Sequence, residues 1–423
     1  MKEDFLHYVW KYQKFDTRNL KTVTGESVIV HSPGMHNSNS GPDFFNGQLE
    51  IDGQMWAGNI EIHLKASHWY NHKHQEDSAY NNVILHVVWK YDTPVKRTNT
   101  SEIPTIELKH WIPATTRSAY KKLFDRANRW IPCEPDFYRV DVFTYKNWLD
   151  TLFIERMEHR TDQFAARLEQ LNNDWEALLF HLLSEYFGTK VNSDSFGSIA
   201  TSVNYSLIRK CAGQPGHLEA LLLGQAGLLN QQGGDSYYEK LREEYVFLKN
   251  KFKLRNEHVI PPKFFRLRPM NFPTIRLSQL SMLYSKNQQL FSNLIEASSK
   301  GEYYALLKFE ASEYWKDHYN FGTQSVSRSK LMSNAFIDLL LINVVLPLKF
   351  FYMRTHGQFN DNEFMDLAQS LGAEENGIIR KFAELRPKAT NVLESQALLQ
   401  LKSEYCEKKQ CLRCAIGNWF LKR

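Results

Sequence analysis

Residues 43–65 read DFFNGQLEIDGQMWAGNIEIHLK, and this stretch decides the fold of the N-terminal part of the chain. Apolar and polar residues alternate on both sides of Asp52-Gly53, a pattern typical of a β-hairpin. A two-residue turn at this dipeptide would turn Glu61 away from the face that carries Asp43. A three-residue loop with Gly53 as a left-handed bulge residue would place Asp43 directly opposite Glu61. We expect the three-residue loop, with the two acids roughly 4.5–5.5 Å apart at their Cβ atoms.

The second strand of this hairpin carries chemistry on one face. Side chains alternate along a strand, so Glu61, His63 and Lys65 share a face. Two close carboxylates repel each other unless a cation lies between them, which makes Asp43 and Glu61 candidate ligands for Mg²⁺ or Mn²⁺. Such an ion polarises a phosphate and activates a water molecule. His63 and Lys65 are the candidate catalytic residues, as base and as phosphate contact.

Residues 1–112 predict a mixed α and β module around the hairpin. Its expected order is helix, three strands, helix, strand and strand. The supporting segments are a helical pattern at 5–10, strands at 27–31 and on either side of residues 52–53, and strands at 83–89 and 105–108.

Within this order, Pro42-Asp43 followed by Glu61-Ile62-His63 resembles the PD-(D/E)xK nuclease superfamily. The resemblance implies a restriction-endonuclease-like fold, with Asp43 and Glu61 as metal ligands assisted by the carbonyl of Ile62. It also implies a lysine at position 63, where this chain has histidine. His63 or Lys65 would have to replace that lysine, or the site would be catalytically inactive.

Over its whole length the chain resembles an uncharacterised bacterial family of unknown function. That resemblance implies no activity. It is carried by GPDF at 41–44, EIH at 61–63, LHVV at 85–88, GQAG at 224–227 and the C-terminal cysteines.

The remainder, residues 113–423, predicts a large all-α region, so the expected class is α+β. Apolar stripes at helical spacing recur through it, and they indicate a packed core. Prolines between 255 and 275 suggest a division into two sub-bundles. Residues 224–227 lack the strand context and lysine of a phosphate loop, so we expect a close helix contact there.

Five of the fifteen histidines fall between residues 63 and 86. His72 and His74, beside acidic residues 76 and 77, could bind Zn²⁺ or could simply be solvated. The simpler expectation is that this segment flanks the site at Asp43 and Glu61. His86 lies in an apolar strand and is expected to be a hydrogen-bonded core residue.

Three of the five cysteines form a Cys-x4-Cys-x2-Cys motif: Cys406, Cys411 and Cys414. A structural zinc ion or an iron–sulfur cluster needs four ligands, and Cys133 or Cys211 would complete the set. Cys133 is the preferred fourth candidate. The alternative is that Cys411 and Cys414, at i and i+3, pack on one helix face as small apolar residues.

Composition narrows the class of protein. Hydrophobic residues make up 43% and charged residues 23%, values that exclude wholesale disorder. The longest apolar run, near 336–348, is interrupted by polar residues and a proline, so we expect no membrane partner. Few cysteines and no leader-like N-terminus predict a cytoplasmic location.

Charge is uneven along the chain. Residues 1–112 hold 11 Lys+Arg and 13 Asp+Glu, whereas residues 113–423 hold 41 and 34. A basic region beside an acidic metal site predicts a nucleic-acid partner. The sequence therefore predicts a metal-dependent nuclease or nucleic-acid-processing protein that hydrolyses phosphodiester bonds. The alternative is a scaffold or nucleic-acid-binding protein with a degenerate site and no enzymatic activity.

Overall fold

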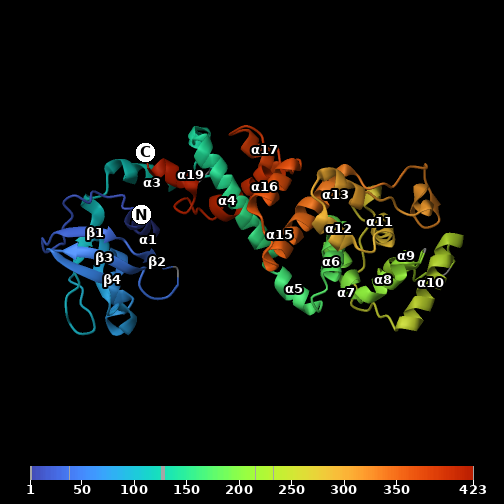
Figure 1. Cartoon of the computed structure of the whole chain (residues 1–423), viewed down its shortest axis with the longest axis horizontal. Coiled ribbons are helices and arrows are strands. Elements are labelled where there is room, and N and C mark those ends of the chain that lie inside the picture. Colours follow the sequence, from blue (N-terminus) through green and yellow to red (C-terminus); the bar gives the residue numbers. More distant parts are fainter. Residues whose placement is uncertain (1, 38, 125–128, 215, 232, 423) are drawn as a thin grey trace. The chain divides into compact units, whose positions relative to one another are not determined.

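The chain folds into two compact units, each described here by itself. The computed structural model describes residues 2–37, 39–124, 129–214, 216–231 and 233–422. The first unit comprises Met1–Trp148 together with Leu401–Arg423, and the second comprises Leu149–Gln400. An N-terminal sheet followed by a helical region confirms the α+β class (Figure 1).

A mixed sheet forms the centre of the first unit. The strand order is β1-β3-β4-β5-β6, with the short β2 paired to β3. β1, β3 and β4 are antiparallel, whereas β5 and β6 run parallel to β4. The strands are β1 (Val28–Ser32), β2 (Met35–His36), β3 (Phe44–Ile51), β4 (Gln54–Lys65), β5 (Val83–Lys90) and β6 (Thr105–Glu107).

The hairpin turn differs from the one expected. Ile51 pairs directly with Gln54, so the turn has two residues, and both Asp52 and Gly53 have positive φ. Such a turn matches the right-handed twist of the strands. The extra residue lies instead at the other end of β3, where the register shifts between Phe44 and Gly47.

Asn46 is the residue that makes this shift possible. Its φ is 57°, a left-handed conformation that asparagine tolerates better than most residues. Beyond the shift, Phe44 pairs with Ile60, which brings the next residues, Asp43 and Glu61, to opposed positions. The expected juxtaposition of the two acids is therefore present, with the bulge at Asn46 and not at Gly53.

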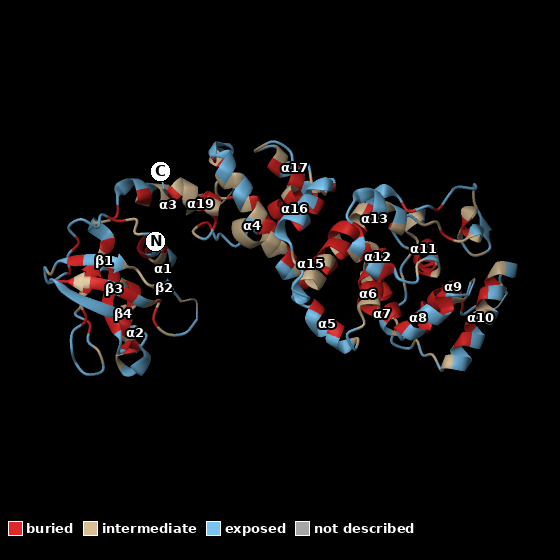
Figure 2. Ribbon diagram, viewed as in Figure 1, coloured by how far each residue is buried: buried red, intermediate tan, exposed pale blue. Residues whose placement is uncertain are grey.

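Helices cover both faces of the sheet. Apolar residues of α1 pack with Ile60 and Ile62 in one core cluster. Trp69 of α2 and Tyr80 of η2 belong to a second cluster with Val88 on the other side. Figure 2 shows buried residues along the central strands β3 and β4. The covering segments are α1 (Glu3–Lys11), α2 (His68–Asn71), η1 (His74–Glu76) and η2 (Ser78–Tyr80).

The C-terminal segment returns to the first unit. Its helix α19 (Ala415–Leu421) contacts α3 (Ala114–Phe124), and the two lie side by side in Figure 1. Leu421 belongs to the same core cluster as Tyr120 and Leu123. The boundary expected near residue 112 therefore falls inside this unit. Its remaining elements are η3 (Leu108–His110), η4 (Glu134–Arg139), the start of α4 (Val142–Thr161) and the π-helix η8 (Leu401–Cys406).

The second unit is almost entirely helical. Between α10 and α11 the chain lacks a long helix, as the prolines suggested, yet the unit is not divided there. Its helices are α5 (Phe164–Gln170), α6 (Trp175–Phe187), α7 (Thr189–Thr201), α8 (Tyr205–Ala212), α9 (His217–Gln225), α10 (Ser236–Phe252), η5 (Pro269–Asn271), α11 (Pro273–Lys286), α12 (Leu290–Glu296), α13 (Lys300–Leu307), η6 (Glu313–Lys316), α14 (Asn334–Leu340), the π-helix η7 (Leu341–Val345), α15 (Leu346–Thr355), α16 (Asp361–Ser370), α17 (Gly377–Ala383) and α18 (Val392–Gln400). Strands β7 (His318–Asn320) and β8 (Thr323–Gln324) form a small hairpin.

Two local features of this unit bear on the sequence analysis. A Cβ on Gly224 would collide with the ring of Tyr245, which confirms the close helix contact expected at residues 224–227. The segment Asn334–Thr355 is continuous and, by length and composition, apolar enough to cross a membrane. In the structure 67% of the most apolar 18-residue stretch of this segment is buried, as in a core helix. The segment is therefore weak evidence for a membrane span.

Candidate functional site

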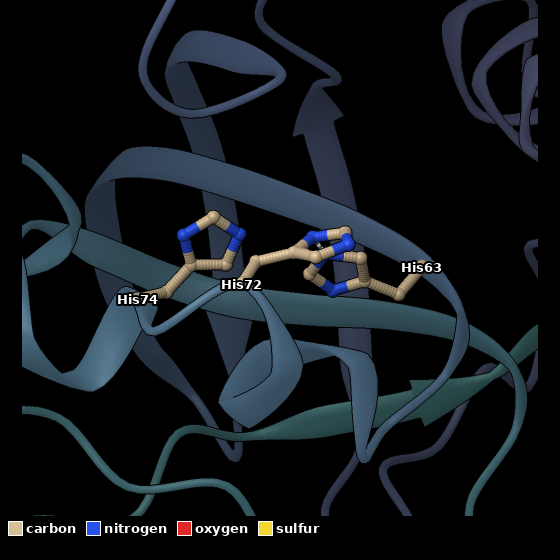
Figure 3. Close-up of side chains that lie close together, drawn as sticks. All are labelled: His63, His72 and His74. Carbon is tan, nitrogen blue, oxygen red and sulfur yellow. Dashed lines mark hydrogen bonds between the residues drawn. The ribbon is translucent and has the colours of Figure 1, made fainter.

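Three histidines meet at one point beside strand β4. Ring nitrogens of His63, His72 and His74 all lie within 4.8 Å of one another, close enough to bind a single metal ion. His63 comes from β4, His72 directly follows α2, and His74 begins η1. Figure 3 shows their rings gathered between the strand and this covering segment. His63 and His74 are buried and His72 is exposed, so the histidine cluster (His63, His72 and His74) opens to solvent on one side.

Glu61 extends the histidine cluster with a carboxylate. Its Oε1 lies 3.5 Å from Nε2 of His63 and 3.3 Å from Nε2 of His74. Nε2 of His63 is in turn 3.2 Å from Nδ1 of His72. Metal–nitrogen bonds of about 2.0–2.1 Å place neighbouring ligands of a tetrahedral ion about 3.3–3.4 Å apart. Each of these three spacings matches a pair of neighbouring ligands, but among the described residues the side chains whose ligand atoms all lie within 4.8 Å of one another are the three histidines alone.

A fourth histidine orients the first. Nδ1 of His63 is 2.9 Å from Nε2 of His86, which lies fully buried on the neighbouring strand β5. His86 is thus a hydrogen-bonded core residue, as expected. This hydrogen bond orients the ring of His63, and in the tautomer in which Nδ1 donates to His86, Nε2 of His63 is left as an electron-pair donor. Both nitrogens of His63 face other histidines, an arrangement that suits a ligand better than the expected free base.

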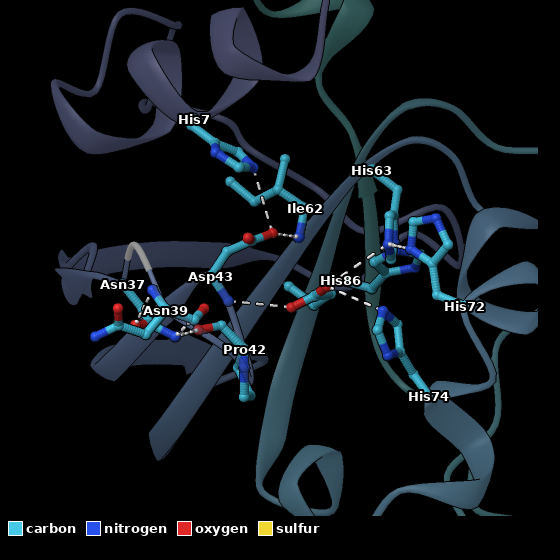
Figure 4. A network of polar contacts seen from close by, with 11 residues as sticks. His7, Asn37, Asn39, Pro42, Asp43, Ile62, His63, His72, His74 and His86 are labelled. Carbon is cyan, nitrogen blue, oxygen red and sulfur yellow. Dashed lines mark hydrogen bonds and ion pairs between the residues drawn. The ribbon is translucent and has the colours of Figure 1, made fainter. Parts of the chain in front are cut away.

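Asp43 lies on the other side of Glu61. Its backbone N–H donates to Oε2 of Glu61 at 3.1 Å, so the two acids are linked without their carboxylates meeting. The carboxylate of Asp43 accepts the N–H of Ile62 at 2.9 Å and lies 3.3 Å from Nε2 of His7. Figure 4 shows His7 on helix α1 pointing toward Asp43, with His63, His72 and His74 farther along the network.

The loop before Asp43 is held by one asparagine. Nδ2 of Asn37 donates to the carbonyl oxygens of Asn39, Ser40 and Pro42, each at 3.1 Å. Its backbone N–H donates to the carbonyl of Asp43 at 2.7 Å. This network, also drawn in Figure 4, fixes the approach of Asp43 to the sheet.

Burial controls the charges in the site. It raises the pKa of Glu61 to about 9, with nearby Asp43 adding to the shift. It lowers the pKa of His63, His74 and His86, that of His86 to about 3. His63, His74 and His86 are therefore neutral at pH 7, and a neutral imidazole is the form that binds metals. When no cation is bound, the uncharged form of Glu61 is favoured.

His7 has the opposite shift. Burial by itself lowers the pKa of His7, but the nearby carboxylate of Asp43, with the acids Glu3 and Asp4, outweighs this effect, and the net shift is upward. His7 and Asp43 thus form an imidazole–carboxylate pair beside Glu61, able to hold a proton.

The structure brings some predicted residues together and leaves one apart. Asp43, Glu61 and His63 belong to one network of contacts. Lys65 lies exposed at the end of β4, and none of the described contacts of the network includes it. His7 was not predicted. No local sequence signal identifies it, because only the packing of α1 against β4 brings it to the site.

Comparison with known proteins gives one match. A family model described as "Protein of unknown function (DUF2851)" matches residues 3–377. No curated protein and no solved structure matches the chain. The model covers most of the chain, and the protein therefore belongs to this family of unknown function.

Proposed function

We propose that the first unit is a divalent-metal-dependent hydrolase that cleaves phosphodiester bonds in nucleic acid. The observation that carries this proposal is the position of Glu61. One of its oxygens faces His63 and His74, and the other accepts the N–H of Asp43. A buried carboxylate among neutral imidazoles is costly unless a cation is bound beside it.

The donor set narrows the choice of metal. Three imidazoles and one carboxylate suit Mn²⁺ or Zn²⁺, whereas Mg²⁺ prefers oxygen ligands alone. Glu61 and the histidine cluster would hold the ion, and exposed His72 marks the side from which substrate arrives. A bound ion of this kind polarises a phosphate oxygen and lowers the pKa of water.

Three features support a phosphodiester substrate. With the two-residue strand β2 and the short helices η1 and η2 set aside, the order α1, β1, β3, β4, α2, β5 is compatible with the order that the PD-(D/E)xK resemblance would imply. The resemblance would assign its two acids to Asp43 and Glu61, which the register of β3 and β4 brings to opposed positions. The excess of Lys and Arg in residues 113–423 favours a polyanionic substrate.

The chain's own residues would handle the proton. In hydrolysis the water oxygen bonds to phosphorus, the bond from phosphorus to the leaving oxygen breaks, and a proton passes from the water to that oxygen. The pair His7 and Asp43 is the group beside Glu61 suited to carry this proton.

A second candidate is a binding protein with no catalysis. It is favoured by His63, a buried residue held by His86 at the position where the resembled superfamily has lysine. In this alternative the same fold binds nucleic acid, and the buried network has a structural role.

Cleavage assays on the full chain separate these candidates. Single- and double-stranded DNA and RNA would be incubated with the protein and with Mn²⁺, Zn²⁺ or Mg²⁺. We expect metal-dependent cleavage that falls at least ~10²-fold in His63→Ala and in Glu61→Gln. His31→Ala is the matched control, because His31 forms a similar pair with Glu50 on an exposed part of the same sheet.

The outcomes are distinct. Cleavage that persists in both site variants would reject the proposed active site. Tight binding of nucleic acid without cleavage under any metal would favour the binding protein.

A further inference from the structure

Four of the five cysteines line a single small cavity in the first unit. Cys133, Cys406, Cys411 and Cys414 are four of the ten residues that line the cavity, and most of the other six are apolar. Four cysteines among ten lining residues, in a chain with five cysteines in 423, is far beyond what ordinary apolar packing produces. From these contacts we propose that Cys133, Cys406, Cys411 and Cys414 bind a metal centre that fastens the C-terminal segment to the first unit.

The chemistry of the cavity indicates which class of ligand would bind there. Its volume of about 10 Å³ is close to the least that a buried water needs. Apart from the sulfur atoms its lining is largely apolar, so water would find few partners. Four thiolates are the ligand set of a structural zinc ion and of an iron–sulfur cluster. The shared chemistry is a thiophilic metal bound by four sulfurs.

The local backbone brings the four cysteines to the wall of one cavity. Cys406 ends the π-helix η8, and Cys414 is the residue that precedes α19. Between them the N–H of Cys414 donates to the carbonyl of Cys411 at 3.3 Å. A Cβ on Gly417 would collide with that same carbonyl, so the segment from Cys411 to Gly417 requires glycine at this position. Cys133 joins from the turn that precedes η4.

Positive charges lie near the sulfurs. Burial and the neighbouring thiols raise the pKa of Cys133, Cys406 and Cys411, and the charges of Arg129, Lys402 and Lys409 respectively oppose that rise. Nη2 of Arg129 is buried with no hydrogen-bond partner among the described residues. Cations in these positions offset the excess negative charge of a metal with four thiolates.

The position of the site indicates a role in stabilising the first unit. Cys133 and the other three cysteines are separated by more than 250 residues of the chain, yet both segments belong to the first unit. A crosslink that closes so long a loop stabilises a fold more than a short one does. Metal binding would hold α19 against α3, whereas a metal-free protein would rely on their apolar contacts alone.

The experiment must exclude metal bound at the histidine cluster. We would therefore purify the full chain without air in the Glu61→Gln/His63→Ala background, and measure zinc, iron and acid-labile sulfide. We expect either about one zinc per chain without sulfide, or iron with sulfide and a brown colour. The first result identifies a zinc site and the second an iron–sulfur cluster, and both support the proposal independently of the proposed nuclease.

Two variants test the ligands. Cys411→Ser should lower the bound metal at least tenfold, whereas Cys211→Ser should leave it unchanged, because Cys211 is buried in the second unit. If Cys411→Ser fails to fold, thiol titration of the unaltered chain replaces it. Chelation should then expose about four additional reactive thiols and speed proteolysis near the C-terminus. Absence of metal and sulfide, with reactive thiols unchanged by chelator, would overturn the proposal.

Discussion

Replacing Glu61 by glutamine should separate stability from metal binding. In the metal-free protein, burial raises the pKa of Glu61 from 4.5 to about 9. The folded state therefore binds a proton between pH 4.5 and 9 that the unfolded state does not bind. The free energy of unfolding falls as pH rises through this range. At pH 7 the loss amounts to about 3 kcal/mol, at ~1.4 kcal/mol per pKa unit.

A glutamine at position 61 carries no charge in the folded or the unfolded state, so the free energy of unfolding does not fall with pH in this way. Its carbonyl oxygen can still accept the N–H of Asp43, and its amide can donate to Nε2 of His74. We therefore expect metal-free Glu61→Gln to unfold at a temperature on the order of 5–10 °C higher than the metal-free parent at pH 7. At pH 4.5 the two proteins should unfold together.

Metal should close most of this difference. A ligand present at 100 times its dissociation constant stabilises the folded state by about 2.7 kcal/mol. The parent should gain this stability with Mn²⁺ or Zn²⁺, and Glu61→Gln should gain little of it. Differential scanning calorimetry of chelated and metal-loaded proteins at both pH values measures these shifts. A variant that is less stable without metal, yet responds to metal as the parent does, would refute our interpretation of Glu61.

Three further changes probe the fold. Asn46→Val should cost about 1–2 kcal/mol, because a branched residue is strained at a φ of 57°. By disturbing the bulge that aligns Asp43, it should also reduce the metal-induced shift in unfolding temperature. Asn46→Gly should do neither. Glu176→Gln should raise urea resistance by about 1–2 kcal/mol at pH 8 and little at pH 4.5, since burial raises the pKa of Glu176 to about 7 and solvent screens part of the cost. Equal effects at both pH values would contradict this. Gly224→Ala should destabilise by about 1–3 kcal/mol in urea, because its Cβ meets the ring of Tyr245. A neutral result would show that the two helices can move apart.

Alternation along the chain was sufficient to predict the strands, but not the bulge that aligns them. A loop at Gly53 and a bulge at Asn46 both oppose Asp43 to Glu61, so periodicity cannot separate them. The dipeptide Asn46-Gly47 offered a local signal, because asparagine tolerates positive φ. The turn itself followed the ordinary preference of Asp-Gly for two-residue hairpins.

Long-range packing accounts for what the sequence left out. His63 shares a face with Glu61 by alternation alone, and His72 and His74 were placed near the site as flanking residues. His7 is more than 30 residues from Asp43 in the sequence, and only the docking of α1 brings them together. The return of residues 401–423 to the first unit has the same cause. It depends on apolar contacts between α19 and α3 that no local pattern encodes.

A function in ligand binding explains the buried position of Glu61 better than a role in stability does. A chain selected for stability alone would replace Glu61 with an apolar residue, because an isolated buried carboxyl weakens the fold at neutral pH. Instead Glu61 is surrounded by neutral imidazoles that cannot neutralise it, while a hydrogen bond from Asp43 holds it in place. Local destabilisation of this kind is typical of sites that gain a ligand, since the bound cation repays the loss. The same reasoning applies to His86, whose hydrogen bond would hold the ring of His63 in place for the metal that we propose.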